Sequence, residues 1–274
     1  VMTRYRVDAT HANSFAAYVM DTIKLDPQGE ITGGVRWDYF DMVYKDQNYS
    51  TTTPGLVTRT DTIPRTDRMF SYRGALVYKP DTNASLYFAY GTSFNPSGEE
   101  LSFVVSSRSF NLSNADLAPE KNSNLELGGK WDAFGGRLSL TAALFQAEKD
   151  NARVPDPTNA VLNVLAGDFR VDGLELGAVG HITDAWQIQA GYACLDSSVI
   201  KSAAGAAPVG AALMNTPKHT VTAWTTYNLG DGWEIGGGGR YASSQFALIA
   251  LPSKTVHGFF TADAMARYTL SQKW

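Results

Sequence analysis

The chain has little of what most soluble domains and most membrane helices rely on. Its single cysteine, Cys194, allows no intramolecular disulfide and no cysteine-based zinc site. No run of about 18 apolar residues occurs, and the nearest candidate, residues 203–214, is broken by Gly205, Pro208 and Gly210. The sequence therefore predicts no transmembrane helix, so this chain could cross a membrane only as a β-barrel.

Charged residues are also scarce, at 18% of the chain against about a quarter in typical globular proteins. The formal net charge of -4 offers no basic surface, which argues against nucleic acid as a partner. Glycine, by contrast, is abundant with 25 residues, and the aromatic residues reach 12%. This combination suits strands whose outer face meets something other than water.

Residues 119–151 show the organising pattern most clearly. Leu125, Leu127 and Trp131 fall on one face, and the polar or small residues between them fall on the other, which is the period of a β-strand. After a break at residues 134–136 the alternation resumes from Leu138 to Leu144. The pattern predicts a long hairpin whose arms, about a dozen residues each, could cross a bilayer at a tilt.

The same hairpin pattern recurs along the chain. Further strands are predicted at residues 11–25, 30–44, 68–79, 84–95, 168–182, 186–196, 217–229, 233–247 and 259–270. Tight turns are predicted at residues 26–29, 80–83, 134–136, 183–185 and 230–232. Long loops are predicted at residues 45–67, 96–118, 150–167, 197–216 and 248–258. The total is about 11 strands, with tight turns and long loops in strict alternation.

This alternation predicts the fold class. In an up-and-down antiparallel sheet, odd connections lie at one end and even connections at the other, so one rim has short turns and the other long loops. Outer-membrane barrels have that asymmetry. The sequence therefore predicts an all-β, transmembrane, antiparallel up-and-down β-barrel, of which these strands form a part.

Aromatic and polar residues support the same interpretation. Aromatic residues near the predicted strand ends match the girdles at the two membrane interfaces: Trp37, Tyr78, Trp131, Trp186, Trp224, Tyr227, Trp233 and Tyr268. Polar residues at alternate positions predict a water-accessible interior face, carried by Ser139, Thr141, Gln187, Gln189, Glu234, Arg240, Asp263 and Arg267.

Several segments resemble the barrel of TonB-dependent siderophore receptors, closest to the catecholate and ferrichrome-type branch. They are YFAYGTSFNPS at 87–97, LAPEKNSNLELGGKW at 117–131, GRLSLTAALFQAEKDNAR at 136–153, FRVDGLELGAVGHITDAW at 169–186, AGYACLDS at 190–197 and NTPKHTVTAWTTYNL at 215–229. They occur in the family's order and span nearly the whole chain beyond His11.

The resemblance implies a barrel of about 22 strands closed by an N-terminal plug domain. It also implies a ferric siderophore as transported ligand, no covalently bound cofactor, and energy from the TonB-ExbB-ExbD complex acting through the plug. Outer-membrane lipid and lipopolysaccharide would surround the barrel, in the bacterial outer membrane. Because no plug and no final strands are recognisable, residues 1–274 are expected to be a partial receptor barrel.

No catalytic or metal constellation is predicted, so the chain is expected not to be an enzyme. The histidines, His11, His181, His219 and His257, are widely spaced and match no metal-ligand motif. The glycines at 236–239 are followed by no Gly-Lys-Ser/Thr and no helix pattern, so a phosphate-binding loop is not indicated.

A ferric catecholate complex is anionic and aromatic, so cationic and aromatic residues near the looped rim are the candidate contacts. The candidates are Tyr44, Tyr49, Arg59, Arg65, Phe94, Phe103, Arg108, Phe110 and Arg153. Phe94 and Arg153 are favoured because each is expected where a strand gives way to a long loop.

Two other functions fit the same barrel pattern. A passive porin would have no plug and loops folded inward, and an adhesive barrel would bind a protein partner through its loops. The sequence does not name the siderophore, because loops vary most and carry specificity.

Overall fold

A computed structural model describes residues 6–96, 118–155, 163–202, 208–248 and 254–270. It contains thirteen strands: β1 (Arg6–Lys24), β2 (Gly29–Tyr49), β3 (Val57–Asp81), β4 (Ala84–Asn95), β5 (Glu120–Ala133), β6 (Leu138–Pro155), β7 (Asn163–His181), β8 (Trp186–Lys201), β9 (His219–Gly230), β10 (Trp233–Ala242), β11 (Gln245–Leu248), β12 (Lys254–Val256) and β13 (Phe259–Tyr268). Among these residues no helix is long and apolar enough to cross a membrane.

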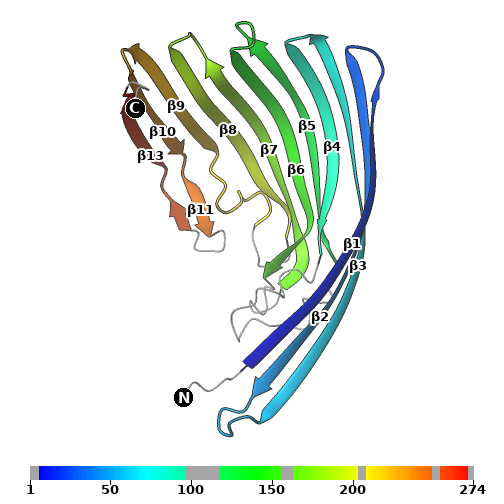
Figure 1. Cartoon of the computed structure of the whole chain (residues 1–274). Helices are drawn as coiled ribbons and strands as arrows, with labels where there is room; N and C mark the ends of the chain where they lie inside the picture. The colour runs from blue at the N-terminus through cyan, green and yellow to red at the C-terminus, as the bar shows by residue number, and fades with distance from the viewer. Residues whose placement is uncertain (1–5, 97–117, 156–162, 203–207, 249–253, 271–274) are drawn as a thin grey trace.

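Eleven of the strands form one antiparallel sheet in the order β1 to β10 and then β13. Each strand pairs with its neighbour in sequence, except that the small β11–β12 hairpin stands apart and lets β13 pair with β10. Figure 1 shows the sheet as a curved wall with the tight turns along one edge. The predicted up-and-down topology is confirmed, as is the predicted number of about 11 strands for the main sheet, whereas β11 and β12 are additional.

The first turn shows why the short-turned edge is tight. The Oδ1 atom of Asp26 accepts hydrogen bonds from the backbone N–H groups of Gln28, at 2.7 Å, and Gly29, at 2.6 Å. An aspartate that binds the backbone two and three residues on closes a turn without extra chain. The antiparallel pairing of Lys24 with Glu30 then fixes the register of the hairpin.

Three of the predicted loops are wrong over part of their length. The structure continues β2 to Tyr49 and begins β3 at Val57, so most of the segment predicted as a loop at 45–67 is strand. Likewise β6, β7 and β8 run into the segments predicted as loops at 150–167 and 197–216. Outside the bilayer a strand can be polar on both faces, so the apolar alternation that locates strands is lost there.

Pro64 lies within β3, although proline has no N–H group to donate to a sheet. In the structure Pro64 lies opposite Val43 of β2, whereas the pairing of β3 with β4 begins only at Arg73. Among the described residues this part of β3 pairs with β2 alone, and an unpaired strand edge is where a strand tolerates proline. The structure also ends β10 at Ala242, earlier than the predicted strand end at residue 247.

Directly paired residues point to the same side of a sheet, so the register sorts side chains into two faces. We call one the apolar face: it holds the row Ile23, Ile31, Leu76, Phe88, Leu127, Leu144 and Leu174. Leu127 and Leu144 are 55% and 57% exposed, which fits contact with lipid acyl chains. The opposite side is the polar face, and it holds every residue predicted for the water-accessible interior.

Most of the predicted girdle residues lie on the apolar face, including the directly paired Trp233 and Tyr268, whose ring centroids are 4.9 Å apart. Trp224 is the exception. It lies opposite Gln189 and Gly238, and therefore on the polar face. The prediction for Trp224 was wrong because residue type alone does not reveal which parity of a strand faces lipid.

Gly180 gives a test of the β6–β7 hairpin. Its φ of 139° is a conformation that residues with a side chain rarely adopt, and an added Cβ would lie 2.1 Å from the carbonyl oxygen of Arg137. We expect Gly180→Ala to lower the free energy of unfolding by about 1–3 kcal/mol. Gly33→Ala is the matched control, because nothing lies within 4 Å of an added Cβ there. Equal thermal unfolding of the two variants in detergent would contradict the strain at Gly180.

Candidate functional site

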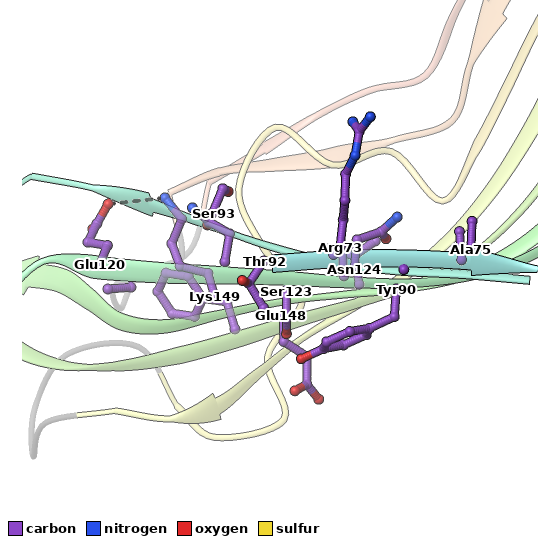
Figure 2. A pocket seen from close by; sticks show the side chains of 18 of the residues that line it. Arg73, Ala75, Tyr90, Thr92, Ser93, Glu120, Ser123, Asn124, Glu148 and Lys149 are labelled. Carbon is purple, nitrogen blue, oxygen red and sulfur yellow. Dashed lines mark hydrogen bonds and ion pairs between the residues drawn. The ribbon is translucent and has the colours of Figure 1, made fainter. Parts of the chain in front are cut away.

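An open groove of about 880 Å³ runs along the sheet from β3 to β7. Figure 2 shows that its bordering side chains fall on two sides of the sheet, with Arg73 and Asn124 projecting to one side and Tyr90 and Glu148 to the other. The part on the polar face is bordered by the polar side chains of Arg73, Ser93, Glu120, Asn122, Asn124 and Lys149. This part is the candidate ligand site.

The register explains why the site is open around Arg73. On the polar face, the row that contains Arg73 continues through Gly91, Asn124, Ala147 and Val171. Because Gly91 and Ala147 are small, the row leaves space beside the arginine. The register therefore places the long side chain of Arg73 beside small residues on the polar face of the sheet.

Lys149 supplies a second cation to the groove. Its Nζ lies 3.3 Å from Oε2 of Glu120, and the side-chain amide of Asn95 donates to the same oxygen at 3.2 Å. Figure 2 shows the Lys149–Glu120 pair as a dashed line. Glu120 is buried whereas Lys149 is partly exposed, so Lys149 remains within reach of a ligand while its charge is partly compensated.

Arginines on the polar face are usually paired with a carboxylate. Side-chain pairs join Arg36 to Asp38 at 2.7 Å, Arg59 to Asp61 at 2.6 Å, Arg65 to Asp67 at 2.7 Å, and Arg267 to Glu234. In three of them the aspartate lies two residues further along the same strand, which puts both side chains on one face.

Arg73 departs from this rule. Within the part of the chain that the structure describes, no carboxylate pairs with it, and its Nη2 contacts the sulfur of Met20. Its guanidinium is exposed on the polar face and borders the groove. Arg73 is therefore a cation whose hydrogen-bond donors are available to an anion.

Aromatic rings lie flat on the wall beside the groove. A Cβ on Gly173 would lie 2.3 Å from Cζ of Phe145, and a Cβ on Gly128 would lie 2.4 Å from the hydroxyl of Tyr87, so each ring covers its opposing glycine. The Tyr87 hydroxyl donates to Glu126. Phe169 borders the groove itself. The site thus combines an uncompensated cation with aromatic surface.

The ligand-contact candidates predicted from the sequence lie elsewhere than the groove, as far as the structure describes their side chains. Tyr44 lies on the polar face within β2, where it is buried at 1% exposure and its hydroxyl donates to Oδ1 of Asp8 at 2.8 Å. Tyr49 ends β2, and its hydroxyl donates to Gln47 at 3.4 Å. Arg59 and Arg65 are held in the ion pairs described above. None of these four residues borders the groove.

Of the two favoured candidates, Phe94 does not border the groove. Phe94 pairs with Lys121 and takes the apolar face, while its neighbours Ser93 and Asn95 take the polar face. Arg153 lies on β6 opposite Leu165, and its side chain is outside the description. Phe103, Arg108 and Phe110 lie outside the described residues. As ligand contacts, all nine residues predicted from the sequence stay predictions.

Sequence reasoning missed Arg73, Asn122, Asn124 and Lys149 because it searched loops and strand ends. A usable signal was present in the spacing. Arg36, Arg59 and Arg65 each have an aspartate two residues later, whereas position 75 is an alanine, so Arg73 lacks a same-strand partner. This spacing is a partial signal, because Arg267 also lacks an aspartate two residues later and yet pairs with Glu234 of the neighbouring strand.

Comparison with known proteins identifies the family of this chain. The family model described as "TonB dependent receptor-like, beta-barrel" matches residues 2–274. A probable TonB-dependent siderophore receptor, PiuA, of Acinetobacter baumannii is 34% identical over 97% of this chain and 36% of its own length. The catecholate siderophore receptor Fiu of Escherichia coli is 29% identical over 99% of this chain and 38% of its own length.

Solved structures agree. The closed form of Fiu superposes with a TM-score of 0.84 at 26% identity, over 97% of this chain and 39% of that one. The structure of PiuA superposes with a TM-score of 0.81 at 32% identity, over 96% of this chain and 38% of that one. The chain thus spans little more than a third of the proteins it matches, and it belongs to the TonB-dependent receptor β-barrel family.

Proposed function

We propose that this chain is the ligand-binding wall of an outer-membrane receptor that imports a ferric siderophore, with a ferric catecholate as the ligand class. As a member of its family the chain forms part of an outer-membrane barrel, with the apolar face toward lipid and the polar face toward the interior. The observation that carries the proposal is the uncompensated guanidinium of Arg73 in a groove beside aromatic side chains.

The chemistry of the ligand matches this site. Catecholate oxygens carry negative charge when they bind ferric iron, and Arg73 can donate two parallel hydrogen bonds to adjacent oxygens. Lys149 adds a second positive charge on β6, and Phe169 offers a ring face or edge to the catechol ring. The relatives PiuA and Fiu bear siderophore receptor names, and Fiu is a receptor for catecholates.

Import against a gradient needs energy, and the family supplies it through TonB. We therefore propose coupling to the TonB-ExbB-ExbD complex, with the barrel acting as a receptor without catalytic chemistry. Outer-membrane lipid and lipopolysaccharide would contact the apolar face. In a passive porin or an adhesive barrel, uptake of the ferric complex would not depend on TonB.

Growth and uptake test the proposal. A strain that lacks the gene for this protein is compared with its parent on a panel of single iron sources, including the ferric complex of 2,3-dihydroxybenzoate. We expect loss of growth and of ⁵⁵Fe uptake on a catecholate source, with the same loss in a strain lacking TonB. Unchanged uptake from every catecholate source would contradict the proposal.

A further inference from the structure

Arg240 on β10 is a second arginine of the polar face that lacks a carboxylate partner. Its direct neighbours across the sheet are Thr222 on β9 and Thr261 on β13, so its parity is that of the polar face. Within the described residues, no carboxylate forms an ion pair with it, unlike Arg36, Arg59, Arg65 and Arg267. Among the side chains that the structure describes, Arg73 and Arg240 are therefore the polar-face arginines without a carboxylate partner.

The surroundings of Arg240 hold its guanidinium without consuming its donors. Cζ of Arg240 lies 5.9 Å from the centroid of the Phe259 ring, and Phe259 pairs with Ala242 on the same face. An arginine that packs on a ring through its flat face keeps its N–H groups, which lie at the edge, free for an anion. A carboxylate partner would instead occupy those N–H groups.

Two hydroxyls add donors at the same place. Thr222 and Thr261 flank Arg240 on directly paired positions, where side chains are typically about 5 Å apart at Cβ. The nearest carboxylate in the register, that of Asp263, is diagonal to Arg240 and forms no ion pair with it. The cluster therefore offers a planar cation and two hydroxyls facing the barrel interior.

We propose that Arg240, Phe259, Thr222 and Thr261 form a second anion site of the barrel interior, separate from the groove at Arg73. The planar donor edge and the two hydroxyls suit a carboxylate or a phenolate. Seven strands along the sheet order from β3, this site faces the interior from another part of the wall. The anion comes either from the ferric ligand, which rests on the proposed function, or from an acidic side chain elsewhere in the intact protein.

Arginine modification tests the proposal and separates the two sources. Intact protein purified from outer membranes is treated with phenylglyoxal, with and without the ferric complex of 2,3-dihydroxybenzoate, and modification is measured at each arginine by peptide mass spectrometry. Arg36 is the internal reference, because Asp38 already occupies its donors. Arg240→Gln and Arg36→Gln change the net charge equally and serve as matched variants.

Two results support the site. Protection of Arg240 only when the complex is present, with a Kd at least fivefold higher in Arg240→Gln than in Arg36→Gln, identifies the ligand as the source. Protection before any complex is added, with a lower unfolding temperature for Arg240→Gln than for Arg36→Gln, identifies an acidic side chain of the protein. Any other combination overturns the proposal.

The outcomes also separate this site from the proposed function. If Arg73→Gln weakens binding of the complex while Arg240 passes neither test, the second site is refuted and the proposed function stands. If the unaltered protein does not bind the complex, the catecholate assignment fails, yet ligand-free protection of Arg240 remains measurable.

Discussion

Arg73→Gln is expected to weaken binding of the ferric complex of 2,3-dihydroxybenzoate by tenfold or more. The substitution removes the positive charge and the forked donors that no carboxylate of the described residues uses. A hydrogen bond to a charged group contributes about 1.5–3 kcal/mol, and about 1.4 kcal/mol corresponds to tenfold in Kd. Binding is measured by quenching of tryptophan fluorescence in the intact protein, at several salt concentrations.

Two variants control for other effects of the substitution. Arg36→Gln removes the same charge from the polar face at a position where Asp38 already binds the guanidinium, so its Kd is expected to stay within about twofold. Arg73→Lys keeps the charge and loses the fork, so an intermediate Kd is expected if adjacent oxygens are recognised. A wild-type Kd for Arg73→Gln would remove Arg73 from the site.

Leu144→Arg is expected to lower the free energy of unfolding by about 2–4 kcal/mol. Leu144 lies on the apolar face opposite Leu127 and Leu174, and it is 57% exposed, so in the membrane an arginine there would face acyl chains. The measurement is the folded fraction of the intact protein in lipid vesicles, across a denaturant series.

Ala143→Arg is the matched control, one residue away on the polar face. Ala143 pairs with Gly128 and Glu175, so the new cation would meet water and a carboxylate. We expect Ala143→Arg to cost far less than Leu144→Arg. If Ala143→Arg lowered the free energy of unfolding more than Leu144→Arg, the polar face would be the one that meets lipid. Arg73 could then not be placed in the barrel interior.

Local alternation was enough to predict the strands inside the membrane band. In the arms at residues 125–132 and 138–144, side chains alternate between the lipid and the water side. The sequence shows this directly as an alternation of apolar with polar or small residues. The predicted turns followed from the same short-range chemistry, as the two backbone hydrogen bonds to Asp26 show. The parts of β2 and β3 near Tyr49 and Val57 escaped prediction because water on both faces erases the contrast.

The candidate site was less accessible to sequence reasoning. Phe94 was favoured as a residue at a strand end, yet its parity opposite Lys121 puts it on the apolar face, away from Ser93 and Asn95. Lys149 and Glu120 are far apart in sequence and meet only because β5 pairs with β6. Assignment to a face requires the register as well as the residue type.

The sequence by itself determined that this chain forms an antiparallel up-and-down wall with an apolar side and a polar side, because strand periodicity and turn chemistry act over a few residues. Only the tertiary structure decided which cations remain available for a ligand. Whether an arginine is neutralised depends on the carboxylate that the register brings beside it, and on the polar face Arg73 and Arg240 have none among the described residues.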